Sequence, residues 1–168
     1  MSVVLAIDPG NIDSAFCVID SESRRPLRFD KVANKELARL VKEELQPFDE
    51  FVIERVQSYG MAVGKSVFQT CEWTGRFVQI VSDVALDIPV SYIYRKDEKL
   101  HICGDSRAKD TNIRMALIDR FAKTANGKGT KKEPDWFYGF KADIWAAYAC
   151  GITYIEKGPS EKEDAYED

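Results

Sequence analysis

Three acidic residues stand beside apolar segments, where carboxylates could serve metal-assisted hydrolysis. Asp8 closes an apolar run and is followed by a Pro-Gly turn, which reverses the chain and leaves the carboxylate at the strand end. Glu54 follows a second apolar run, and Asp143 lies early in a helix predicted over residues 139–154. Carboxylates brought together repel one another unless a cation lies between them. Divalent metals are common partners of such clusters and activate water for phosphodiester hydrolysis.

The hydrophobic pattern predicts the elements that would bring these acids together. Strands are expected over residues 3–8, 14–20, 27–32, 51–53 and 90–94, with helices over residues 34–45, 62–86, 107–123 and 139–154. This order predicts an α/β fold with one central mixed five-stranded sheet flanked by helices. The first and fourth strands would be parallel neighbours, so Asp8 and Glu54 would emerge at the same edge. Taken singly, each acid also fits a solvated surface position.

Composition is that of a folded protein without a zinc site. The chain has 168 residues, of which 45% are hydrophobic, and no apolar run approaches the roughly 18 residues of a membrane span. No signal peptide is expected either, which favours a cytoplasmic protein. One His and no C-x-x-C pair argue against zinc, and buried free thiols are expected at Cys17, Cys71, Cys103 and Cys150.

Charge is distributed unevenly along the chain. The net charge is −4, and residues 156–168 hold six acids and two lysines, so this acidic segment accounts for it. We expect one folded domain over residues 1–155 and a disordered tail over residues 156–168. Residues 95–132 hold eleven Lys or Arg against five acids, a surplus of six. This segment suits phosphate binding, and a solvated helix face is the alternative.

Three motifs in order resemble a known family. AIDPGNIDSAFCVID, VIERV and KADIWAAYACG are similar to segments of the RuvC-like Holliday junction resolvases, of bacteriophage type, in the RNase H-like (retroviral-integrase) superfamily. The resemblance spans residues 3 to about 154. It implies an RNase H-like fold and a homodimeric endonuclease that nicks four-way junctions and other branched DNA, in the bacterial host cytoplasm if phage-encoded. It implies that Asp8, Glu54 and Asp143 are catalytic and bind Mg²⁺, with Mn²⁺ as the alternative ion.

The same resemblance implies a set of DNA contacts. Residues 104–109, GDSRAK, are similar to a family segment that places a DNA-contacting lysine before a helix, which assigns Lys109 and its neighbour Arg107. Lys99 matches a second family lysine on the preceding strand region. Family members also carry an aromatic or apolar side chain after the glutamate of strand four. Tyr59 is the candidate here for stacking on an exposed base, and a half-buried loop aromatic is the alternative.

The chain departs from the family pattern at the start of the last helix. The family usually has two aspartates three residues apart, whereas this chain has Asp143 with Phe140 three residues earlier. The motif therefore does not assign the residues that would bind a second metal ion. Asp135 is one candidate substitute, and Lys141 could instead neutralise phosphate or take the place of one cation.

The long helix over residues 62–86 carries more apolar surface than one core stripe needs. In the family the corresponding helix packs against its two-fold mate, so Val67, Phe68 and Trp73 are candidate dimer contacts, with ordinary core packing as the alternative.

Three other functions compete with the resolvase. The first is a branched-DNA or RNA-binding module with weak or no cleavage, and the second is an RNase H-type ribonuclease. The third, an actin-like ATPase, is disfavoured because that fold needs a second phosphate loop and about twice the length.

Overall fold

The computed structural model describes residues 1–160, so most of the predicted tail lies outside the described residues. Within them the chain forms five strands and five helices. They are β1 (Val3–Asp8), β2 (Asp13–Asp20), β3 (Pro26–Ala33), α1 (Asn34–Glu43), β4 (Glu50–Arg55), α2 (Lys65–Val84), β5 (Val90–Tyr94), α3 (Arg95–Cys103), α4 (Asp110–Phe121) and α5 (Ile144–Lys157). None of these helices has the length and apolar character needed to cross a bilayer.

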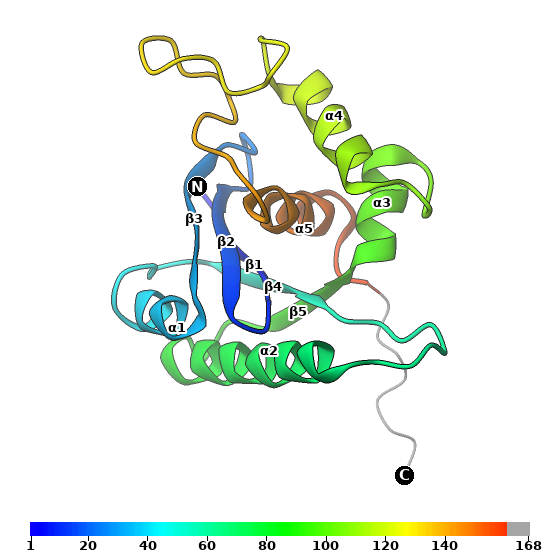
Figure 1. Ribbon diagram of the computed structural model, residues 1–168. Helices are drawn as coiled ribbons and strands as arrows, with labels where there is room; N and C mark the ends of the chain where they lie inside the picture. The colour runs from blue at the N-terminus through cyan, green and yellow to red at the C-terminus, as the bar shows by residue number, and fades with distance from the viewer. Residues whose placement is uncertain (161–168) are drawn as a thin grey trace.

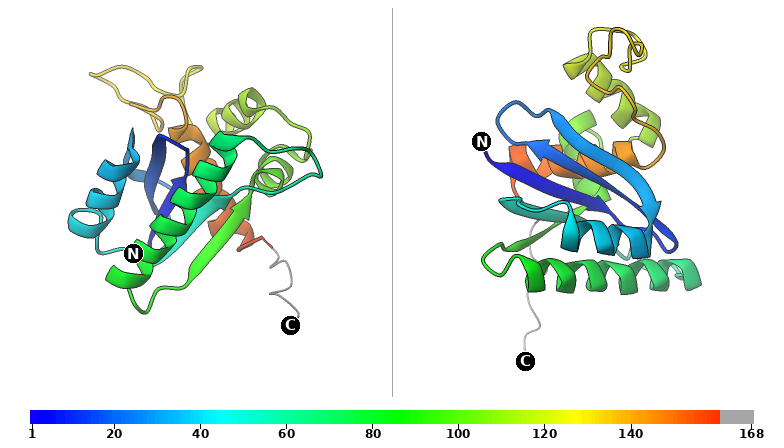
Figure 2. Two further views of the ribbon diagram at one scale, coloured as in Figure 1. Left: turned by 60° about the horizontal axis from the view of Figure 1, so that its bottom comes forward. Right: turned by 90° about the vertical axis from the view of Figure 1, so that its left-hand side faces the viewer.

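The five strands form one mixed sheet, as the sequence predicts. Their spatial order is β3-β2-β1-β4-β5, with β1 antiparallel to β2 and parallel to β4 (Figure 1). Helices α1 and α2 cover one face, and α5 covers the other with α3 and α4 beside it (Figure 2). Because both faces are covered, the central strands are apolar at nearly every position.

Alternation along β1 explains how this strand serves both layers. Val4 and Ala6 belong to the core cluster beneath α5, whereas Leu5 and Ile7 belong to the cluster beneath α1 and α2. Successive side chains in a strand point to opposite faces, so Asp8 follows Ala6 onto the α5 face. The last residue of the strand therefore places its carboxylate on the side where α5 begins.

A glycine sets the distance between α5 and the sheet. A Cβ atom at Gly151 would lie 2.3 Å from Cδ1 of Ile19 and 3.1 Å from Cβ of Ala6, closer than packed atoms approach. The helix can therefore lie directly on β1 and β2 only because this position has no side chain. The same helix begins next to Asp143, so this contact also fixes the height of that carboxylate above the sheet.

The helix predicted over residues 107–123 is present as α4, but the prediction missed α3, which precedes it. Gly104 adopts the left-handed conformation (φ 73°) that ends α3, and α4 begins at Asp110. Lys99, predicted on a strand region, lies within α3 instead. The prediction for α5 also needs correction, since Asp143 is the residue that precedes the helix rather than one within it.

Ordered structure continues past residue 155, where the predicted domain ends. Helix α5 continues through Lys157, and Ser160 bonds through its backbone N–H to the carbonyl of Tyr92. Glu156, which the sequence placed in the tail, forms ion pairs with Arg120 and Arg24 and a hydrogen bond with the ring of His101. The folded body therefore extends to the end of the described residues.

Glu156→Gln should lower the free energy of unfolding at pH 7 by about 1–2 kcal/mol. The hydrogen bond from Arg120, followed by that from His101, lowers the pKa of Glu156 to about 2. A carboxyl with a depressed folded pKa stabilises the fold above its unfolded pKa, and this contribution disappears as the pH falls from about 4.5 to 2. Urea unfolding at several pH values should show that the free energy of unfolding falls less steeply below about pH 4.5 in the variant than in the wild type. Glu72→Gln, on the exposed face of α2, should change neither the free energy of unfolding at pH 7 nor its dependence on pH.

Candidate active site

One row of residues crosses the sheet on the face that α5 covers. Asp8 on β1 pairs with Ala15 on β2, and Ala15 pairs with Lys31 on β3. On the other side, the parallel register between β1 and β4 pairs Ile7 with Ile53, so the residues that follow, Asp8 and Glu54, lie side by side. Directly opposed residues share a face of a sheet, so the two acids and the lysine point to the same side. The small side chain of Ala15 leaves space between Lys31 and Asp8.

Asp143 approaches this row from α5. Ala142, with a left-handed backbone (φ 47°) that is uncommon outside glycine, turns the chain just before the carboxylate. Nζ of Lys31 lies 2.7 Å from Oδ2 of Asp143. Burial raises the pKa of Asp8 well above its usual range, and the negative charges of Glu54 and Asp143 raise it further. Of the three acids predicted from the sequence, Glu54 and Asp143 therefore both lie within electrostatic reach of Asp8.

Beside Lys31, the structure adds Arg95, Glu98 and Asp110 as charged residues that the sequence interpretation did not place at the site. Arg95 begins α3, and its guanidinium lies 3.5 Å from Glu54 and 3.4 Å from Glu98 and also contacts Asp110. Glu98 is completely buried. The segment RKDEK reads as a solvated helix face, and only the spacing of three residues between Arg95 and Glu98 hints at their pairing.

The buried acids carry oxygens that lack hydrogen bonds. Within the described part of the chain, Oε2 of Glu54 and Oε1 of Glu98 are buried without a hydrogen-bond partner. Burial raises the pKa of both carboxyls, and in Glu54 the nearby Arg95 acts in the opposite direction. Buried polar atoms without partners cost free energy, so a cation that engages them would stabilise the site.

The donor chemistry fits a divalent ion such as Mg²⁺, which prefers carboxylate oxygens. As the side chains stand in residues 1–160, however, no three His, Cys, Asp or Glu residues converge at ligating distance. Lys31 instead neutralises Asp143, and Arg95 neutralises Glu54. A bound metal would therefore compete with two basic side chains for its ligands.

Asp135, the suggested replacement for the missing acid, serves another purpose. Its carboxylate accepts hydrogen bonds from the backbone N–H groups of Lys123, Thr124 and Trp136 and from the hydroxyl of Thr124. These bonds hold its pKa well below the usual range and close the loop that follows α4. Phe140 is buried in the core. Neither position supplies a carboxylate to the row on the sheet.

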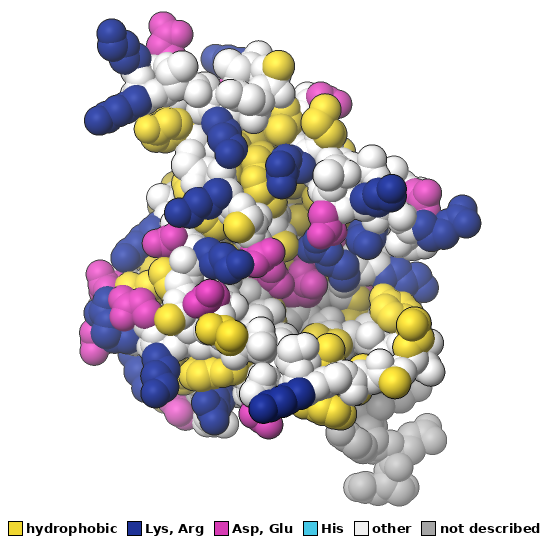
Figure 3. All heavy atoms as spheres, in the orientation of Figure 1, with side chains coloured by type: hydrophobic (Ala, Val, Ile, Leu, Met, Phe, Trp, Pro, Cys, Tyr) yellow, Lys and Arg dark blue, Asp and Glu magenta, His cyan; other side chains and the backbone are white. Residues whose placement is uncertain are grey.

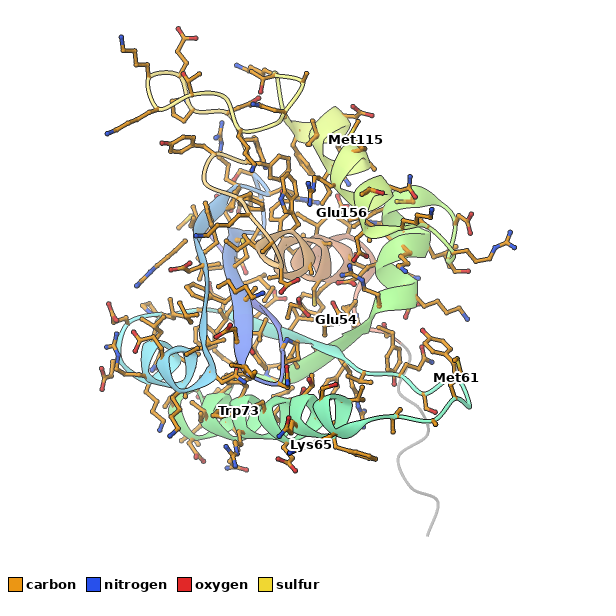
Figure 4. All side chains as sticks on the ribbon, viewed as in Figure 1. Glu54, Met61, Lys65, Trp73, Met115 and Glu156 are labelled. Atoms are coloured by element: carbon orange, nitrogen blue, oxygen red, sulfur yellow. The ribbon has the colours of Figure 1, made fainter. Side chains whose placement is uncertain are left out.

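Three of the four predicted DNA-contacting residues share a recess with Arg95, which pairs with Glu54. Tyr59, Lys99 and Arg107 line one surface recess, together with Arg95. Lys109 is exposed at the start of α4, so the predicted lysine before a helix is present. Acidic side chains lie near the centre of the face in Figure 3, with Lys and Arg around them. Glu54 lies centrally in Figure 4, whereas Met61, on the loop with Tyr59, lies at the periphery.

The candidate dimer contacts on α2 differ in exposure. Phe68 is 59% exposed, whereas Val67 is half-buried. Trp73 is also half-buried and packs on Phe77, with 5.6 Å between ring centroids. Phe68 is therefore free of the core, and Trp73 partly belongs to it.

No protein-family model matches the chain, and no curated protein matches it. Among solved structures, it is similar to Thermus thermophilus RuvC, with a TM-score of 0.66 at 16% identity over 90% of this chain and 92% of that chain. It is also similar to T. thermophilus RuvC in complex with Holliday junction substrate, with a TM-score of 0.66 at 14% identity over 92% of each chain. These similarities confirm the predicted RNase H-like fold.

Proposed function

We propose that this chain is a divalent-metal-dependent endonuclease that nicks four-way (Holliday) junctions and other branched DNA. The observation that carries the proposal is the placement of Asp8 and Glu54 side by side on the sheet, with Asp143 on the same face and a basic recess adjoining them. The same fold in a RuvC protein solved with Holliday junction substrate supports branched DNA as the substrate class.

Asp8, Glu54 and Asp143 would hold Mg²⁺ or Mn²⁺. A bound divalent ion supplies an activated water and stabilises charge on the leaving oxygen of a phosphodiester. The chain itself fixes the first ligand: the Ser14 hydroxyl accepts a hydrogen bond from the N–H of Gly10, and the Asn34 amide donates to the carbonyl of Gly10. The turn after Asp8 is thereby held rigid, which keeps the carboxylate oriented without substrate.

The basic residues would position the DNA. Lys99, Arg107 and Lys109 would contact backbone phosphates, and Tyr59, 65% exposed on the loop before α2, would stack on an unpaired base. Phosphate contacts orient nucleic acid but do not read its sequence. We therefore expect selectivity for branch structure to come from how several DNA arms fit around the site.

Lys99→Ala or Lys109→Ala should weaken junction binding across sequences and reduce the salt dependence by about one charge each. The reason is that each lysine that neutralises a phosphate releases a counterion on binding. Titration of a labelled junction at several salt concentrations measures the slope. Lys42→Ala, on α1 beyond the opposite face of the sheet, should leave it unchanged. An unaltered slope in both site variants would show that this basic segment faces away from DNA.

The proposed enzyme is a homodimer that pairs through α2. This helix forms the outer layer beneath the sheet (Figure 1), and it carries the exposed Phe68 and, five residues later, the partly buried Trp73. Two copies related by a two-fold axis would present two sites to a junction of nearly two-fold symmetry.

Phe68→Glu should convert the dimer to a monomer and replace paired nicks by single ones. A charge buried at the centre of an apolar interface is strongly destabilising. Light scattering after size exclusion measures the mass of the protein in solution. Cleavage of a cruciform plasmid distinguishes single nicks from paired nicks. Met115→Glu is the matched control, since Met115 is 54% exposed on α4, away from α2 in Figure 4. A wild-type monomer would contradict the dimer.

Cleavage of an end-labelled four-way junction tests the proposed function directly. A duplex, a fork and an RNA–DNA hybrid serve as comparison substrates, each with Mg²⁺, with Mn²⁺ and with a chelator. Metal-dependent paired nicks in the junction are the expected result. Junction binding without cleavage would favour a binding module, an alternative supported by the neutralisation of Asp143 and Glu54 by basic side chains. Cleavage of the hybrid alone would make the chain a ribonuclease.

A further inference from the structure

Arg95 lies where the acidic and basic halves of the site meet. It lines the recess that contains Tyr59, Lys99 and Arg107, and it also lines the adjoining hollow that contains Asp110 and Asp143. Its side chain is 27% exposed, so the guanidinium is accessible from both hollows. A phosphate that entered from the basic recess towards Asp143 would pass this residue.

Three elements hold the guanidinium in place. Glu54 comes from β4, Glu98 from the next turn of α3, and Asp110 from the start of α4. Glu98 is fully buried beneath it, so its carboxylate cannot swing out to solvent. An arginine fixed by several carboxylates loses little further freedom when it binds a ligand. Its five N–H groups outnumber the three acids, so N–H groups remain that can donate to a phosphate oxygen.

Two features argue against a second metal ion beside Glu54. Position 140 is a buried phenylalanine and Asp135 is engaged in its loop, so the fourth carboxylate of a two-metal site is missing from both places. A positive charge already lies 3.5 Å from Glu54. A second divalent cation beside Glu54 would have to displace this charge or be repelled by it.

Building on the proposed nuclease function, we propose that the site binds one metal ion and that the guanidinium of Arg95 takes the place of a second. In this arrangement Arg95 contacts the phosphate that is cut. Asp8, Glu54 and Asp143 bind a single divalent ion, and the guanidinium stabilises negative charge that develops on the phosphate oxygens. Fixed positive charge aimed at such oxygens is an effective means of lowering a phosphoryl-transfer barrier. Glu98 acts as a positioning residue through Arg95.

Mn²⁺ binding and junction cleavage, measured on the full chain, test this assignment together. Calorimetry and electron paramagnetic resonance should give one Mn²⁺ per wild-type chain. Arg95→Gln should bind Mn²⁺ more tightly, because a competing charge is gone, yet cleave about 100-fold or more slowly. Arg95→Lys should keep one ion and recover only part of the rate. Arg39→Gln is the matched control, because Arg39 also pairs with three acids, on α1, and should change neither measurement.

Opposite changes in metal affinity and rate distinguish a catalytic role from a structural one. A structural arginine would lose Mn²⁺ binding and cleavage together, and that result would overturn the assignment. Two Mn²⁺ per wild-type chain, or wild-type cleavage by Arg95→Gln, would overturn it as well. If Arg95→Gln does not fold, the stoichiometry of the wild type and the rate of Arg95→Lys decide. A wild type that neither binds Mn²⁺ nor cuts branched DNA would instead refute the nuclease function itself.

Discussion

Asp8→Asn should reduce metal-dependent junction cleavage by at least about 100-fold and leave junction binding intact. Asp8 lies centrally in the acidic group, within the fields of both Glu54 and Asp143. An amide of the same shape keeps the packing but removes the negative charge that a divalent ion requires. Denaturing gels of an end-labelled junction measure cleavage, and mobility shifts in a chelator measure binding.

The same substitution should not destabilise the metal-free protein. Burial disfavours the charged form of Asp8, so a neutral amide removes a repulsion from Glu54 rather than a stabilising bond. Thermal unfolding in a chelator should show a midpoint no lower than that of the wild type. Asp30→Asn, exposed on β3, is the control and should cleave normally. Full activity in Asp8→Asn would remove this residue from the site.

Gly151→Leu should lower the free energy of unfolding by about 3 kcal/mol. The new side chain would have to enter the space of Ile19 and Ala6, which α5 covers without a gap. The better helix propensity of leucine offsets about 1 kcal/mol of this loss at most. Urea unfolding monitored by circular dichroism measures the change.

Gly75→Leu gives the matched comparison. Gly75 also lies within a helix, but a Cβ there would have no other atom within 4 Å. This variant should be as stable as the wild type or more stable by up to about 1 kcal/mol. Equal effects at both glycines would show that helix propensity, rather than the contact of α5 with the sheet, determines the result.

The sequence predicts the sheet and the acidic half of the site because both depend on local patterns. Apolar strands that end in Asp8 and Glu54 are visible in the chain, and their parallel pairing follows from the order of the elements. Lys31 could not be found in this way. It reaches Asp143 only because three strands pair in a particular register, which no local pattern reveals.

The region around α3 was misread for a different physical reason. Helices are recognised by apolar residues at steps of three and four, but here a buried position is occupied by the charged Glu98. Its burial is offset by Arg95, a partner whose importance appears only when β4, α3 and α4 are assembled. Where side chains serve a site rather than a core, the hydrophobic pattern loses its predictive value.

The alternation of β1 between two layers has an evolutionary consequence. Because neighbouring positions face opposite sides, deletion of one residue ahead of Asp8 would rotate its carboxylate into the apolar layer and bring Ile7 onto the α5 face. Substitutions in this strand can be accepted one at a time. A change in its length would instead move every side chain that follows it to the opposite face of the sheet at once. We expect lineages that descend from this chain to vary in the residues of β1 but to keep its length.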